Sequence, residues 1–304
     1  MNMQANAMHE PFQAQSVEPA TIPATRVFYW SVRRELWENR SIYIAPLAVA
    51  AAVVLGFTIS IIAGIWERQL RLDPGHAQRP FDLAAGVLML TAILVSAFYC
   101  LDALHSERSD RSILFWKSLP VSDATTVLAK ASIPLIVVPL LTFAIVIAMQ
   151  WIMLLVSSAV LLVSGQNVGA LWKSLSLAGM WLLLLYHLLA AHVLWPFPIY
   201  CWLLLVSGWA RRATFLWAAL PLVVIAGVEG IVFRTARFAA LIGRRFIGDA
   251  PAMSMAPDSM GLDPHTTHVT VARFLSSPGL WIGIAVAAVF LAAAVRLRRY
   301  QGPI

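Results

Sequence analysis

The sequence predicts an all-α polytopic membrane protein with six transmembrane helices. The 304 residues are 60% hydrophobic and only 12% charged, and the mean hydropathy is +0.77. In a soluble domain, about 25% of the residues are charged. Long apolar runs recur along the chain, and one folded core could not bury so much apolar surface without lipid.

Six apolar runs are long enough to span a bilayer, since one crossing needs about 20 residues. They are residues 42–65, 83–101, 131–163, 174–206, 215–233 and 279–295. The third and fourth runs exceed one crossing but are too short for two crossings and a turn. The third contains Pro134 and Pro139, and the fourth contains Trp195-Pro196-Phe197-Pro198, so each is interpreted as a single kinked helix.

The basic residues predict the orientation of these spans. With a cytoplasmic N-terminus, 13 of the 22 Lys and Arg residues fall in inner segments and 9 in outer ones. Short inner loops count most in this comparison, so both termini are predicted to be cytoplasmic. The net charge of +7 is interpreted as this orienting excess and not as a surface for nucleic acid.

Residues 1–25 are expected to form a polar, disordered tail, and residues 26–304 a single transmembrane domain. The tail contains three prolines and lacks the features of a signal peptide. Residues 26–40 then predict an amphipathic helix at the cytoplasmic interface, with Glu35 and Glu38 facing away from the apolar side. An ordinary basic flank of the first span is the alternative. The apolar arc of this helix contains Tyr29, Trp30, Val32, Leu36 and Trp37.

No sequence motif for catalysis is evident. The segment 169–174 resembles a phosphate-binding loop only superficially, and neither a nucleophile elbow nor a zinc-protease motif occurs. Cys100 and Cys201 fall in apolar runs, which favours buried thiols. His265 and His268, with nearby aspartates in the last outer loop, favour a solvated loop over a metal site. No catalytic, cofactor or metal site is therefore expected.

Polar residues inside spans are candidates for a structural or transport role, because burying them in lipid is costly. Glu229 is expected to pair with Arg234 or Arg237, or to line a substrate path. Gln150 is expected to bond another helix, and His187 to pack as a neutral side chain.

The segment ERSDRSILFWKSLPVSD, residues 107–123, places an apolar patch inside a charged loop. Ser112 or Asp110 is expected to cap a short helix that Pro120 ends. An exposed apolar patch of this kind favours a docking surface for a partner. The alternative is a re-entrant loop packed on its own spans. The patch consists of Ile113, Leu114, Phe115 and Trp116.

This segment resembles the coupling-helix loop of the type-2 family of ABC transporter permeases. Two positions depart from the family pattern, since Arg111 stands where Gly is usual and Leu114 where an acidic residue is usual. The interfacial helix, the six spans and the long outer loop before the last span also fit the family. The matching residues are Glu107, Arg108, Ser112, Ser118, Pro120, Val121 and Ser122.

The resemblance implies a transport subunit of the bacterial inner membrane that is not itself an enzyme. Such a subunit pairs with a second permease, and each copy binds a separate ATPase subunit, which carries ATP and Mg. The few intramembrane charges favour export of a hydrophobic or amphipathic substrate. Arg111 and Lys117 would pair with acidic residues of the ATPase. The residues expected to contact the ATPase are Arg111, Ile113, Leu114, Phe115, Trp116, Lys117, Leu119 and Pro120.

Two other classes stay open from the sequence. A membrane-embedded lipid-modifying enzyme would need a convergent polar site at one leaflet. A stand-alone secondary transporter would need intramembrane charges and repeated halves, which are not evident here.

Overall fold

The computed structural model describes residues 23–64, 78–119, 121–165, 167–247 and 274–304, and these residues contain helices but no strand. The elements before the first long loop are α1 (Ala24–Glu38) and α2 (Ser41–Ile62). The next group is α4 (Arg79–Asp102), α5 (His105–Ser109), α6 (Ser112–Ser118), α7 (Asp123–Ser132), η2 (Ile133–Val137) and α8 (Val138–Val163). The remainder are α9 (Val168–Ser174), α10 (Leu177–His187), η3 (Leu188–Leu194), α11 (Phe197–Trp209), α12 (Thr214–Val228), η4 (Glu229–Phe233), α13 (Arg237–Ile247) and α16 (Pro278–Tyr300).

Six helical segments of the described residues are long and apolar enough to cross a membrane, as the sequence predicts. The chain is therefore a multi-pass helical membrane protein. The segments are Ser41–Ile62, Arg79–Ser109, Asp123–Val163, Leu177–Leu194, Thr214–Phe233 and Pro278–Tyr300.

The third segment is one continuous helix, as expected. Helix α7 passes through the π-helical turn η2 directly into α8. Pro134 lies within this turn and Pro139 at the start of α8. Proline lacks the backbone N–H of a regular helix, and the wider π turn accommodates this defect without ending the helix.

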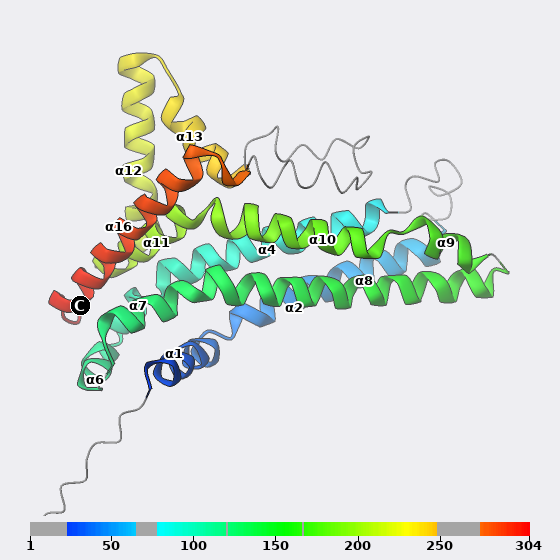
Figure 1. The fold of residues 1–304 in the computed structure, drawn as a ribbon, viewed down its shortest axis with the longest axis horizontal. Helices are drawn as coiled ribbons and strands as arrows, with labels where there is room; N and C mark the ends of the chain where they lie inside the picture. Colours follow the sequence, from blue (N-terminus) through cyan, green and yellow to red (C-terminus); the bar gives the residue numbers. More distant parts are fainter. Residues whose placement is uncertain (1–22, 65–77, 120, 166, 248–273) are drawn as a thin grey trace, which may run out of the picture.

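The fourth segment is interrupted rather than smoothly kinked. Helix α10 continues into η3, the chain then bends at Trp195 and Pro196, and α11 follows. Figure 1 shows α10 and α11 following each other along the bundle instead of folding back. One candidate span, Leu177–Leu194, lies in this stretch, but the prediction of a single kinked helix over 174–206 is wrong, because α11 is a separate apolar helix.

The two largest of four hydrophobic clusters among the described residues lie along the bundle. The first, near the end that carries α9, is built from α2, α4, α8 and α10 and includes Phe57, Leu88 and Met149. The second lies nearer α1 and includes Tyr99 and Tyr200. Helix α16 packs mainly on α11, and its buried side contains Gly283 and Ala287, small residues that let two helix backbones approach closely.

Helix α12 differs from the other spans because it stands away from the bundle, at the upper left of Figure 1. Only 6% of its most apolar stretch is buried, and large side chains such as Phe215, Val223 and Ile231 are exposed. Helix α13 packs on it and extends back toward the bundle.

Both described ends of the chain lie at the same end of the bundle. Helix α1 and the C-terminal part of α16 each contact α7, and α6 lies beside them at the left of Figure 1. This arrangement agrees with the even number of crossings. It places the charged loop of the sequence next to both chain ends.

The close packing of α16 can be tested at Ala287, whose side chain is fully buried. We expect Ala287→Leu to lower the free energy of unfolding by about 1–3 kcal/mol, because extra methyl groups overpack a filled interface. Ala288→Leu is the matched control, since Ala288 is exposed on the same helix. Thermal unfolding in detergent measures both, and equal midpoints would contradict this packing.

Candidate functional site

The short helix α6 begins at a residue with unusual backbone geometry. Arg111 has a φ of 58°, in the left-handed region that glycine adopts without cost. The expectation that Ser112 or Asp110 caps the helix is wrong, because Arg111 occupies the N-cap position and no side chain caps the helix. The Ser112 hydroxyl instead donates to the Glu107 carbonyl oxygen.

The side chains of α6 divide between the protein and its surroundings. Ile113 is 1% exposed and anchors the helix, whereas Leu114 and Phe115 are 59% and 60% exposed. Trp116 is half-buried, and its ring stacks on the Arg34 guanidinium at 3.8 Å while also contacting Phe115 edge-on. Exposed Leu119 follows the helix. The described residues therefore leave an apolar surface made of Leu114, Phe115 and Leu119.

The two basic residues that flank this helix differ in their contacts. Lys117 donates from Nζ to the Gln301 carbonyl oxygen at 2.8 Å, which ties α6 to the segment after α16. Arg111 is exposed. Helix α6 ends at Ser118, as expected for this region, but Pro120 lies outside the described residues.

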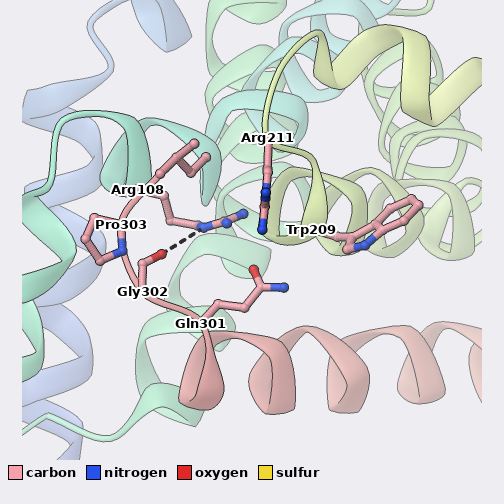
Figure 2. Close-up of a pocket in the computed structure, with 7 residues that line it drawn as sticks. Arg108, Trp209, Arg211, Gln301, Gly302 and Pro303 are labelled. Atoms are coloured by element: carbon pink, nitrogen blue, oxygen red, sulfur yellow. Dashed lines mark hydrogen bonds between the residues drawn. The ribbon is translucent and has the colours of Figure 1, made fainter.

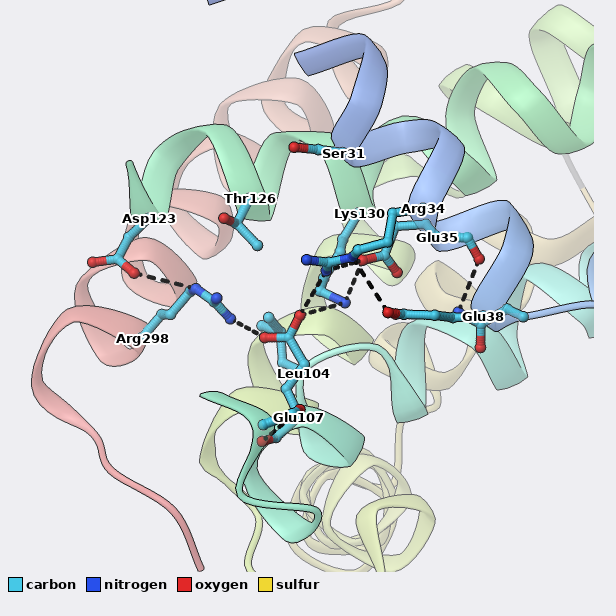
Figure 3. A network of polar contacts seen from close by, with 12 residues as sticks. Ser31, Arg34, Glu35, Glu38, Leu104, Glu107, Asp123, Thr126, Lys130 and Arg298 are labelled. Atoms are coloured by element: carbon cyan, nitrogen blue, oxygen red, sulfur yellow. Dashed lines mark hydrogen bonds and ion pairs between the residues drawn. The ribbon is translucent and has the colours of Figure 1, made fainter. Parts of the chain in front are cut away.

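Behind α6, Glu107 lies at the centre of a buried group of charges, drawn in Figure 3. Its carboxylate accepts hydrogen bonds from Arg298 and Arg34 and pairs with Lys130 Nζ at 3.1 Å. Arg298 also pairs with Asp123 at 3.2 Å. This carboxylate therefore connects α5 with α1, α7 and α16.

A second buried carboxylate, Glu35 of α1, shares two of these cations. Glu35 accepts Lys130 Nζ at 2.9 Å, Arg34 Nη2 at 2.7 Å and the Tyr99 hydroxyl at 2.9 Å. Burial by itself raises the pKa of the Glu35 carboxyl, but Lys130 and Arg34 outweigh it and hold this pKa below its usual value. Glu35 thus stays ionised although it is 1% exposed.

We call these residues the buried ion network. It has three acids, Glu35, Glu107 and Asp123, and three bases, Arg34, Lys130 and Arg298. Each cation lies between carboxylates, and Arg34 also pairs with the exposed Glu38 at 3.5 Å. A network of this kind costs desolvation, but it holds its members in one geometry because removing any partner leaves a buried charge uncompensated.

Helix α1 lies at this end of the bundle, but its faces differ from the prediction. Tyr29, Trp30 and Trp37 are exposed, whereas Leu36 packs partly against the core. Glu35, which was expected on the side away from the apolar arc, is the buried residue of this helix. The apolar residues of α1 are therefore divided between the exposed surface and the core, and the buried side of the helix also carries the charge of Glu35.

The polar residues predicted inside the spans have structural partners. Gln150 donates to the Phe81 carbonyl oxygen and accepts from Trp181, so the expected bond to another helix is confirmed. The Nδ1 atom of His187 lies 2.8 Å from the Leu183 carbonyl oxygen on its own helix.

The Glu229 carboxylate caps the start of α13 and forms no ion pair with an Arg side chain of the described residues. It accepts the backbone N–H groups of Arg237 and Phe238 at the start of α13 and the Thr235 hydroxyl. The three intramembrane candidates, Gln150, His187 and Glu229, lie on different helices and do not converge on one site. The candidate His/Asp cluster in the last loop lies outside the described residues.

Sequence reasoning singled out Glu107 but missed its partners Lys130 and Arg298. Their positions next to predicted spans suggested orienting charges, and the pairs are far apart along the chain. The local signal was Glu35, one of two acids in a segment with four arginines.

No protein-family model, curated protein or solved structure matches the chain. Its function must therefore be inferred from its own residues.

The cation shared by both carboxylates gives a test of the network. We expect Lys130→Met to lower the free energy of unfolding by about 3–5 kcal/mol, because it leaves two buried carboxylates short of a cation. Lys117→Met is the matched control, since its amine is exposed and should cost less than about 1 kcal/mol. Thermal unfolding in detergent distinguishes them, and similar midpoints for the two variants would refute the role of Lys130.

The pH dependence of stability gives a second test. Because the folded-state pKa of Glu35 lies below its usual value near 4.5, its stabilising contribution is present above pH 4.5 and is lost as the pH falls through the folded pKa. We expect Glu35→Gln to flatten the fall in stability below that pH. Glu38→Gln is the control, because burial raises the pKa of Glu38 and reverses the sign of its contribution. Parallel acid profiles for wild type and Glu35→Gln would contradict the assignment.

Proposed function

We propose that this chain is the membrane-spanning subunit of an ATP-driven transporter of the type-2 ABC permease kind, with ATP and Mg bound by a separate subunit. One observation carries the proposal. Helix α6 presents Leu114 and Phe115 outward at the end of the bundle, while the buried ion network directly behind it joins α1, α5, α7 and α16.

The geometry fits a docking element that transmits force from a partner to the spans. Ile113 and Trp116 anchor α6 to the rest of the protein. Glu107 lies in α5, the short helix that comes directly after α4. A force on α6 therefore reaches α4 along the chain and α7 and α16 through ion pairs. An apolar surface on a short helix also matches what a groove on a partner would desolvate.

The backbone of Arg111 supports the resemblance. The family pattern usually has glycine at this position, and Arg111 adopts the left-handed conformation that glycine favours. The departure from the family pattern thus keeps the backbone shape at the start of α6. Leu114, where the family usually has an acid, enlarges the apolar surface.

The end of the bundle with α1, α6 and the C-terminal segment faces the cytoplasm in this proposal, as the positive-inside rule predicts. The membrane is the bacterial inner membrane. Tyr29, Trp30 and Trp37 on α1 would then lie at the headgroup level of the inner leaflet.

A second copy of the chain completes the transporter. Helix α12 is the span with the least cover within one chain, and a symmetric partner would bury part of its apolar side. The substrate that best fits the spans is hydrophobic or amphipathic and is exported. The described intramembrane polar groups mostly satisfy one another or the backbone, which leaves few charges for an ion path.

The proposal is tested by replacing the exposed residues of α6. We expect Leu114→Asp and Phe115→Asp to weaken binding of the ATPase subunit at least about 30-fold, since residues at the centre of an interface contribute about 2 kcal/mol or more. The measurement is co-purification of the detergent-solubilised chain, with the ATP-binding subunit identified by mass spectrometry.

Ser109→Asp is the matched control, because it adds the same charge at an exposed position of the neighbouring helix α5. It should retain the ATPase subunit. Absence of any ATP-binding subunit with the wild-type chain under mild conditions would sink the permease assignment and favour a membrane-embedded enzyme.

A further inference from the structure

A cavity of about 490 Å³ opens beside α6, at the same end of the bundle as the buried ion network. It lies between the end of α5, the turn after α11 and the segment after α16. Its volume is within the range of about 300–1,000 Å³ that small-ligand sites occupy. Its lining includes Arg108, Arg211, Trp209 and Gln301.

Two guanidinium groups dominate this cavity. Figure 2 shows the side chains of Arg108 and Arg211 converging on the same space from different elements. Their positive charges repel each other, and among the described residues no acidic group forms an ion pair with either. An anion between them would remove the repulsion and accept hydrogen bonds from both.

Arg108 is a built part of the site rather than a loose surface side chain. It is 7% exposed, and its Nη1 donates to the Gly208 and Ala210 carbonyl oxygens. Its Nε donates to the Gly302 carbonyl oxygen, as drawn in Figure 2. Its Nη2 has no hydrogen-bond partner among the described residues, so its two N–H groups can donate to a ligand.

The surroundings of the cavity are those of a lipid headgroup site. Trp209 is 47% exposed and contacts Trp217 edge-on at 5.0 Å, and the exposed Phe215 and Leu216 follow in α12. Aromatic pairs of this kind gather at the membrane–water interface, and apolar side chains mark where the acyl chains begin. Basic pockets between spans at the cytoplasmic face bind anionic headgroups.

We propose that this cavity binds the phosphate of an anionic phospholipid, held between Arg108 and Arg211 with its acyl chains along α12. The turn between α11 and α12 would then be fixed by a lipid. This inference needs only the membrane location of the chain and does not depend on an ATPase partner.

The test uses the full chain in detergent, with native mass spectrometry to count bound dioleoyl-phosphatidylglycerol and dioleoyl-phosphatidylcholine. Wild type is expected to prefer phosphatidylglycerol, and Arg211→Gln to weaken that binding about fivefold, the effect of one basic residue at a charged membrane surface. Arg212→Gln is the matched control, since Arg212 is exposed in the same turn but does not line the cavity. It should keep the preference.

Equal retention of phosphatidylglycerol by wild type, Arg211→Gln and Arg212→Gln would overturn the proposal. Competition by millimolar inorganic phosphate, without any preference between the two lipids, would assign the site to a free anion and overturn the lipid assignment. Should Arg211→Gln leave lipid binding unchanged but weaken capture of a protein partner, the cavity would belong to an acidic segment of that partner instead. Thermal unfolding of each variant checks that the chain stays folded.

Discussion

The arrangement of this protein at one end depends on two carboxylates that are buried together with their counter-ions. Glu35 and Glu107 both form ion pairs with Lys130 and Arg34, and Glu107 also pairs with Arg298. None of these charges is stable alone in an apolar interior, so each fixes the position of the others. The amphipathic helix, the loop with α6 and the last span are held in one geometry for this reason.

The network also explains why an exposed apolar helix is compatible with a stable fold. Helix α6 has only seven residues and would not be stable in isolation. It is held by buried Ile113, by the stacking of Trp116 on Arg34, and by the bond from Lys117 to the C-terminal segment. These three contacts leave Leu114 and Phe115 exposed, and Arg34 joins the helix directly to the network.

Much of the fold was predictable from the sequence because hydropathy over a window reports each span independently. The six spans, the continuous third helix and the short helix in the charged loop follow from such local patterns. The face of Glu35 did not, because Val32 and Leu36 pack on the protein while Trp30 and Trp37 are exposed, and a helical wheel cannot distinguish these surroundings. The ion pairs could not be predicted from local patterns either, because Lys130 and Glu35 are 95 residues apart in the sequence and Arg298 and Glu107 are 191 apart.

The most direct measurement of the central claim is the accessibility of α6 in native membranes. A cysteine introduced by Phe115→Cys can be labelled with a membrane-permeant maleimide, against a low background because Cys100 and Cys201 are buried. The account predicts that position 115 is protected in native membranes and labelled in the purified chain, while Ser109→Cys is labelled in both. Equal labelling of position 115 in the two preparations would contradict the claim that a partner covers this helix.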